Sequence, residues 1–143
     1  MDQIEVKKIL KQYRDAIRMV RFLDKKIEEL DDRLTSIKTS RISGMPRGGR
    51  AKTKEDLLSE KIKFEERRDR FRKKAVQKRE QTQTYIDTVL SPKHNDLLTK
   101  HYIDDLSIEE IAEQMPCSYR HAWRIYREAL GMVDVSNMSV NRQ

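Results

Sequence analysis

The chain has 143 residues, of which 38% are charged and 36% hydrophobic, and its formal net charge is +7. Together with only four glycines and three prolines, this balance favours an elongated helical molecule or two small modules over one large globular core. No run approaches the roughly 20 apolar residues that a membrane-spanning helix needs, and the amino-terminal residues lack the apolar core of a signal peptide, so we expect a cytoplasmic protein with no membrane partner.

Cysteine and histidine usage argues against a metal or redox site. The single cysteine, Cys117, excludes an internal disulfide, and its position in a predicted turn suits a small buried residue. The three histidines, His94, His101 and His121, do not have the spacing of metal ligands. We therefore expect no metal and no other cofactor, and we interpret the histidines as ordinary surface or helix residues.

A first long helix is predicted from Val6 to Ile37. Apolar residues recur there in steps of four and three, which is the repeat of about 3.5 residues that keeps one face of a coiled-coil-like helix against a neighbour. The residues in this series are Val6, Leu10, Tyr13, Ile17, Val20, Leu23, Ile27, Leu30, Leu34 and Ile37. The pattern predicts a rod with one continuous buried side.

A second helix is predicted from Thr53 to about Leu90, because Thr53-Lys54-Glu55-Asp56 has the pattern of a capping box. Its buried side is marked by Leu57, Phe64, Phe71, Ala75, Thr82, Tyr85, Ile86 and Val89. Two helices of similar length with one loop predict an antiparallel hairpin over residues 1–90, with Val6 beside Tyr85 or Ile86. Since two helices alone bury little surface, we also expect a homodimer joined through them.

Two basic segments of this hairpin have open interpretations. The loop over residues 40–52 contains three of the four glycines, and its cations Arg41, Arg47 and Arg50 are candidates for an auxiliary DNA contact in a narrow minor groove. The alternative is a flexible, solubilising turn. Residues 67–79 contain eight Lys or Arg and one Asp, which suits either a solvated helix face or a surface that contacts phosphates.

Residues 107–130 predict a helix, a short turn and a second helix. Ser107 is placed to cap the first helix, with Glu110 three residues later reaching back to it. The first helix would bury Ile108, Ile111, Ala112 and Met115 and expose Glu109, Glu110 and Glu113. The second helix would start at Ser118 and bury Ala122, Ile125 and Ala129.

The outward residues of the second helix are suited to nucleic acid. A helix fits the major groove when another helix fixes its tilt, so that its first residues reach base edges. The candidate DNA-binding residues are Ser118, Tyr119, Arg120, Trp123, Arg124 and Arg127. An ordinary helical hairpin in an all-α domain would show the same periodicity, and Trp123 could instead pack with Tyr119, Tyr126 and Leu130 against another helix.

Charge is unevenly distributed between the two parts of the chain. Residues 1–90 hold 25 Lys and Arg against 16 Asp and Glu, whereas residues 91–143 hold 6 against 8. Because phosphate neutralisation supplies much of the affinity for DNA, the carboxy-terminal part alone should bind weakly. A second copy, the basic amino-terminal part or a polymerase would have to add binding energy.

The sequence from Leu90 to Leu130 resembles region 4 of the bacterial sigma-70 family. Tyr102, Leu106, Glu110-Ile111-Ala112, Ser118 and Ala129-Leu130 occupy the matching positions. The resemblance implies a helix-turn-helix that binds promoter DNA through its second helix and contacts RNA polymerase. Three positions depart from the pattern: Pro116 replaces the usual turn glycine, Ala122 replaces the usual valine, and Trp123 replaces a polar DNA-contacting residue. Pro116 should push Met115 out of the helical region and end the first helix early.

The whole organisation is similar to small sigma-factor-like proteins of phages and prophages, related to the ArpU- and RinA-type late-gene activators. We therefore expect an all-α protein with a helical hairpin at 1–90, a helix-turn-helix module at 91–131 and a flexible tail at 132–143. The expected function is transcriptional regulation of phage genes in the bacterial host cytoplasm, with double-stranded DNA, RNA polymerase and a second copy as partners.

Two rival functions follow from the same residues. A protein-interaction adaptor would bind polymerase or a phage assembly partner without reading DNA, and the aromatic stripe from Tyr119 to Leu130 favours it. An enzyme, such as a helical nuclease or hydrolase, is disfavoured because the sequence shows no nucleophile and base pair, no phosphate-binding loop and no carboxylate cluster with metal-ligand spacing.

Overall fold

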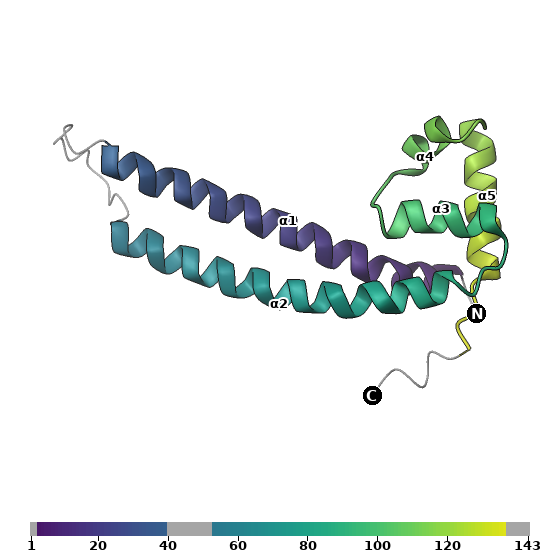
Figure 1. The fold of residues 1–143 in the computed structure, drawn as a ribbon, viewed down its shortest axis with the longest axis horizontal. Helices are drawn as coiled ribbons and strands as arrows, with labels where there is room; N and C mark the ends of the chain where they lie inside the picture. Colours follow the sequence, from purple (N-terminus) through teal and green to yellow (C-terminus); the bar gives the residue numbers. More distant parts are fainter. Residues whose placement is uncertain (1–2, 40–52, 137–143) are drawn as a thin grey trace. The chain divides into compact units, whose positions relative to one another are not determined.

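The computed structural model describes residues 3–39 and 53–136, and the regular secondary structure of these residues consists of α-helices joined by turns and short loops (Figure 1). Its elements are α1 (Gln3–Thr39), α2 (Lys54–Ile86), α3 (Pro92–Tyr102), α4 (Ile108–Gln114) and α5 (Tyr119–Met132). The expected all-α class is confirmed. The basic loop with Arg41, Arg47 and Arg50 lies outside the described residues.

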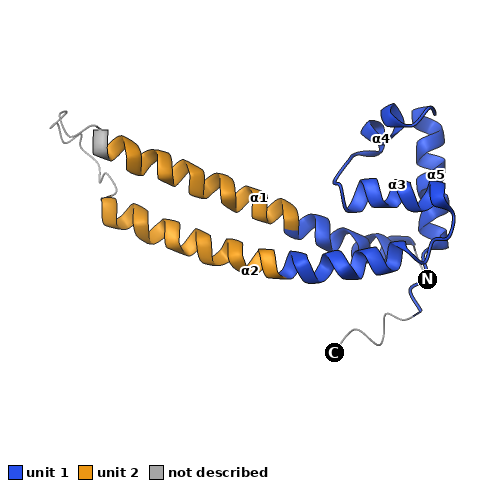
Figure 2. Cartoon of the chain, viewed as in Figure 1, with its two compact units in different colours: residues 1–16, 74–143 blue, residues 17–73 orange. Residues whose placement is uncertain are grey.

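The chain forms two compact units, coloured separately in Figure 2. Unit 1 consists of residues 1–16 and 74–143, and unit 2 consists of residues 17–73. The division into compact units therefore does not fall at residue 90, where a domain boundary was expected. The start of α1 and the end of α2 belong to unit 1 because their apolar residues share a core with the carboxy-terminal helices.

Unit 2 is an antiparallel pair made by the second half of α1 and the first half of α2. Its buried apolar residues follow the predicted series and are Val20, Leu23, Ile27, Leu30 and Leu57. Lys61 Nζ of α2 lies 2.6 Å from Asp31 Oδ1 of α1, and Arg68 donates to Asp24 Oδ1 at 3.3 Å. The bond to Asp31 raises the pKa of Lys61.

The start of α2 is capped as the capping box predicts. The amide of Asp56 donates to Thr53 Oγ1, and the amide of Thr53 donates to Asp56 Oδ2.

Unit 1 has one buried apolar cluster, to which α1 and α2 contribute as well as the three shorter helices. Val6 and Leu10 of α1 belong to it together with Tyr85 and Ile86 of α2, which confirms the pairing expected for an antiparallel hairpin. From α3 the cluster takes Leu97 and others. A helix-turn-helix module is thus packed on the paired ends of α1 and α2.

The second helix ends at Ile86, four residues before the expected end at Leu90. Pro92 occupies the first position of α3 and holds Ser91 in an extended conformation. The Asn95 side chain then donates to the carbonyl oxygens of Ile86 and Val89, at 3.1 and 3.2 Å. The Ile86 carbonyl also accepts a hydrogen bond from the Val89 amide at 2.9 Å, so Asn95 adds a second donor to it and joins the end of α2 to the first turn of α3.

The expectation of a flexible tail from residue 132 is wrong for residues 132–136. Met132 ends α5, and the extended segment after it buries Val133 and Val135 in the core of unit 1. The amide of Asp134 donates to Thr88 Oγ1 at 2.8 Å. Alternating apolar residues allow this short extended segment to cover the cluster on one side. Residues 137–143 lie outside the described part.

Within the described ranges, no helix combines the length and the apolar character needed to cross a membrane.

Candidate nucleic-acid interface

Helix α4 forms the support of the candidate interface, and its start is capped as expected. The Glu110 amide donates to Ser107 Oγ at 3.1 Å, and the Ser107 hydroxyl donates to Glu110 Oε1 at 3.2 Å. Ile108, Ile111 and Ala112 are buried in the core of unit 1, while the three glutamates of α4 are exposed. The helix therefore separates an apolar face from an acidic one.

The turn between α4 and α5 has the geometry that Pro116 predicts. Met115 has a φ of −96° and a ψ of 141°, which lie outside the helical region. Helix α4 therefore ends at Gln114, one residue before Met115, the last residue that the periodicity assigned to this helix. Ser118 then caps α5, since its Oγ accepts a hydrogen bond from the His121 amide at 3.2 Å. The direction of α5 is set by local bonds at its first turn.

Helix α5 buries one face against α3 and α4 and exposes a cationic face. Ala122, Ile125 and Ala129 are no more than 1% exposed, as expected for the inner side. Arg120, Arg124 and Arg127 are all exposed. Their spacing of four and three residues places them on one side of the helix, so a rigid core holds three guanidinium groups along one line.

Trp123 lies between this face and the core. Its ring is half-buried and makes edge-to-face contacts with Tyr126, at 5.5 Å between centroids, and with Tyr119, at 6.1 Å. Tyr126 and Leu130 are buried, whereas Tyr119 is 48% exposed. The sequence also allowed Trp123 to pack with Tyr119, Tyr126 and Leu130 instead of contacting DNA. In the structure Tyr126 and Leu130 pack in the core, and Trp123 does so in part. Tyr119 stays at the surface beside the cap of α5.

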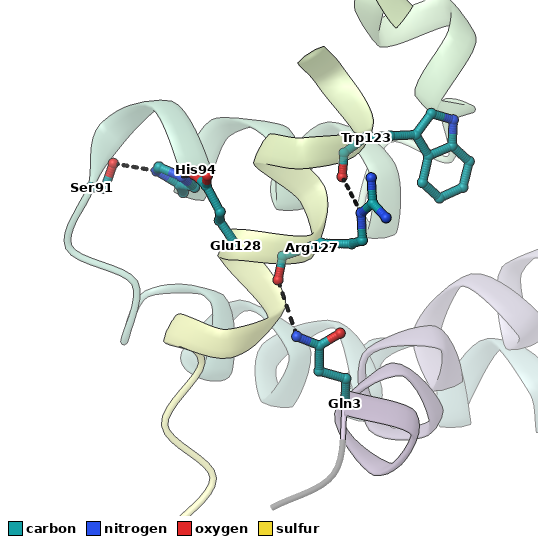
Figure 3. Close-up of polar contacts among 6 residues, drawn as sticks. All are labelled: Gln3, Ser91, His94, Trp123, Arg127 and Glu128. Atoms are coloured by element: carbon teal, nitrogen blue, oxygen red, sulfur yellow. Dashed lines mark hydrogen bonds and ion pairs between the residues drawn. The ribbon is translucent and has the colours of Figure 1, made fainter. Parts of the chain in front are cut away.

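Arg127 is held closer to its own helix than a fully solvated arginine would be. Its Nε donates to the Trp123 carbonyl oxygen at 3.4 Å, and its own carbonyl accepts from Gln3 Nε2 of α1 at 3.3 Å (Figure 3). Of these two bonds, only the one from Nε restrains the Arg127 side chain, and it draws the guanidinium back along α5 toward Trp123.

A buried pair of tyrosines joins α3 to α5 beneath the interface. The hydroxyl groups of Tyr102 and Tyr126 lie 2.6 Å apart, and burial raises the pKa of both. Arg14 of α1 covers the Tyr102 ring at 5.3 Å from its centroid, and its guanidinium lies 3.2 Å from His101 Nε2. Because a carbonyl oxygen only accepts, His101 Nδ1, 2.7 Å from the Leu106 oxygen, must carry the proton.

The interpretation of His94 as an ordinary surface or helix residue is wrong. It is 8% exposed, and its ring links Ser91, at 2.7 Å from Nδ1, to Glu128 of α5, at 2.9 Å from Nε2 (Figure 3). This hydrogen bond lowers the pKa of Glu128. The ionised carboxylate only accepts, so His94 Nε2 donates to it. Ser91, His94 and Glu128 are residue types of a hydrolase triad, but here they tie the first turn of α3 to α5, and we interpret them as an anchor.

Sequence reasoning had a partial signal for this anchor. Ser91, Pro92 and His94 mark a helix start, yet the partner carboxylate is 34 residues away, and only tertiary packing brings it within reach. In the described part of the chain, no group of histidine, cysteine and carboxylate side chains is arranged to hold a metal ion.

We expect the anchor to make the stability of unit 1 depend on pH. The folded-state pKa of Glu128 is depressed from its ordinary value of 4.5, so its stabilising contribution is complete above that value and is lost as the pH falls through the lowered pKa. Glu128→Gln should therefore lower the free energy of unfolding near neutral pH and make little difference at strongly acidic pH. Urea denaturation of both proteins across that range measures the effect, and a difference that stays constant with pH would contradict it.

Comparisons with known proteins give one match. Residues 33–134 match a family model described as "Protein of unknown function (DUF1492)". This segment includes the end of α1, all of α2 and the three helices of the candidate interface. No curated protein and no solved structure matches the chain.

Proposed function

The chain belongs to the DUF1492 family of proteins of unknown function, and we propose that it is a sequence-specific DNA-binding transcriptional regulator whose helix α5 enters the major groove. In this proposal Arg120 and Arg124 contact base edges or phosphates, with Ser118 and Tyr119 at the start of the helix. Arg127 contacts the backbone, and Trp123 supports the cationic face from beneath.

The observation that carries the proposal is the line of exposed arginines on a helix whose opposite face is fully buried. A recognition helix must be rigid, because each base contact depends on side chains starting from fixed positions. The buried Ala122, Ile125 and Ala129 and the cap at Ser118 supply that rigidity. Arginine forms two parallel hydrogen bonds with guanine, which is the commonest specific contact in the major groove.

The acidic side of α4 supports a role for RNA polymerase as the second partner. Glu109, Glu110 and Glu113 are exposed on a helix other than the one that carries the arginines. Acidic side chains repel DNA phosphates and attract basic protein surface. Together with the resemblance to region 4 of sigma-70, this supports an activator that works with polymerase at phage promoters in the cytoplasm of a bacterial host.

Selection of bound duplexes from a random library tests the central proposal. We expect the full chain to enrich one sequence, with a preference that persists at about 200 mM salt, where non-specific binding is weakened. Recovery of duplexes with the composition of the starting library would contradict sequence-specific recognition.

A homodimer is part of the proposal. Leu58 and Ile62 are exposed on one side of α2 in unit 2, at 39% and 55%, and a second copy could cover them. Light scattering at tens of micromolar should then give twice the mass of the chain, and selected sites should contain two half-sites related by symmetry. A monomer mass at that concentration would contradict this partner.

An adaptor without DNA readout is the second candidate, and a groove beside α5 favours it. The groove is lined by Glu109, Ala112, Glu113, Cys117 and Tyr119, and it could receive an apolar side chain flanked by basic residues. Gel-shift experiments with random and selected DNA at two salt concentrations separate the candidates. An adaptor would show no preference for any duplex.

A further inference from the structure

The two edges along which α1 and α2 meet in unit 2 carry different charge arrangements. On one edge, acids of α1 face bases of α2: Asp31 pairs with Lys61, and Asp24 pairs with Arg68 and, at 3.8 Å, with Arg72. Opposite charges face each other across this edge, so it contributes modestly to the pairing of the helices.

The other edge contains a groove in which cations of both helices face each other. Lys26 and Arg33 of α1 and Lys63 and Arg67 of α2 line it. The seven-residue spacing of Lys26 and Arg33 matches that of Asp24 and Asp31, so each pair keeps its own side of α1. The floor of the groove is apolar, formed by the buried Leu30 and the half-buried Phe64.

Pairing of the helices does not explain this second edge. Two carboxylates, Glu29 and Glu60, line the groove beside the four cations, and Glu29 is already 3.5 Å from Lys26 on its own helix. Like charges placed across a shared surface are destabilising. The lining carries four cations against two carboxylates, so its formal charge is positive and an anion in the groove would reduce the repulsion among the cations.

We propose that this groove binds the phosphodiester backbone of a nucleic acid without reading its sequence. The proposal deepens the DNA-binding function above and rests on it. Lysine and arginine are the main contacts of proteins to phosphate oxygens, and Arg67 lies over the Phe64 ring, at 5.9 Å from its centroid, which fixes the position of its guanidinium.

Charge balance favours nucleic acid as the occupant of the groove. Residues 91–143 hold more acids than bases, so the three arginines of α5 neutralise few phosphates by themselves. Non-specific affinity grows with the number of phosphates neutralised. The groove adds four cations, partly offset by Glu29 and Glu60, over an apolar floor, and a phosphate chain carries negative charge along its whole length.

The test compares two variants of the full chain that lose the same charge. Arg33→Gln with Arg67→Gln removes one groove cation from each helix. Lys25→Gln with Lys54→Gln removes one exposed cation from each helix outside the groove. Binding of a random-sequence duplex is measured by fluorescence anisotropy between about 50 and 200 mM salt, and each lost phosphate contact should lower the slope of log affinity against log salt by about 0.9.

The groove variant loses two phosphate contacts, so the magnitude of its slope should fall by about 1.8, and it should bind more weakly at every salt concentration. The control variant should keep the slope of the unchanged chain. Equal slopes for the two variants would overturn the proposal. So would a groove-dependent affinity for poly-glutamate that exceeds the affinity for duplex DNA, because it would assign the groove to an acidic protein.

Failure of the groove and failure of α5 are distinguishable when the selected duplex is measured beside the random-sequence duplex. If the groove variant binds the random duplex more weakly but Arg120→Ala with Arg124→Ala keeps its preference for the selected duplex, the groove proposal stands and recognition by α5 fails. If the α5 variant loses that preference and the groove variant binds the random duplex as the control variant does, the groove proposal fails and the proposed function stands. A chain that binds no duplex at all overturns both.

Discussion

Replacing Arg120 and Arg124 together by alanine should abolish the preference of the chain for its selected DNA site. Each arginine that contacts guanine with two hydrogen bonds contributes about 1 to 3 kcal/mol of discrimination, so loss of both corresponds to a loss of specific affinity of about 30-fold or more. Both side chains are exposed, and their removal leaves the buried face of α5 unchanged. The fold should therefore persist, and circular dichroism should show the same helix content.

The matched control for this variant is Lys8→Ala with Lys11→Ala. These two lysines are exposed on α1 within unit 1, so the control removes the same charge from the same unit. Competition of selected against random duplex, measured for both variants, separates site preference from general attraction. Site preference and salt dependence that are unchanged in the arginine variant would remove docking of α5 in the major groove from the proposal.

Ile125→Ala should have the largest effect on stability. Ile125 is 1% exposed in the core of unit 1, and truncating a buried isoleucine to alanine costs about 2 to 5 kcal/mol, because apolar contacts are lost and a cavity remains. That loss is a large part of the stability of a domain of this size, which is about 5 to 15 kcal/mol. Because the side chain faces away from the arginines, any loss of DNA affinity should follow the fraction of unfolded chain.

Ile4→Ala is the matched control for this second prediction. Ile4 belongs to the same unit but is 57% exposed, so the same chemical change should alter the free energy of unfolding by about 0.5 kcal/mol or less. The chain has one tryptophan, and Trp123 packs on Tyr126 in unit 1, so its fluorescence during urea denaturation reports on this unit. A midpoint for Ile125→Ala that equals that of Ile4→Ala would show that the core tolerates the loss.

Local chemistry explains why several elements could be predicted. The caps at Thr53, Ser107 and Ser118 each use a side chain within three residues of the amide that it satisfies, and Pro116 acts on the residue directly before it. The exposure of Arg120 and Arg124 follows from the periodicity of one helix. None of these features needs a partner that is distant in the sequence.

Apart from the pairing of the two long helices, features that depend on distant partners were not predicted correctly. Asn95 ends α2 by bonding to the carbonyls of Ile86 and Val89, and nothing in its own sequence surroundings indicates those acceptors. His94 was given an ordinary surface or helix role, although the carboxylate of Glu128 holds its ring in a buried position. The groove between α1 and α2 in unit 2 could not be predicted from the sequence, because the rotation of each helix about its axis decides which charged side chains face each other.

The amino-acid sequence alone determined four of the five described helices, α1, α2, α4 and α5, together with their caps and the side of each that is apolar, since these follow from periodicity and from bonds between near neighbours. Helix α3 was not among the predicted elements. Tertiary structure decided where α2 stops and that Val133 and Val135 complete the core of unit 1. The physical reason is that burial and hydrogen-bond partners depend on how the whole chain packs. His94 becomes an anchor only because α5 brings Glu128 within hydrogen-bond distance, and the groove of unit 2 exists only because α1 and α2 both line it.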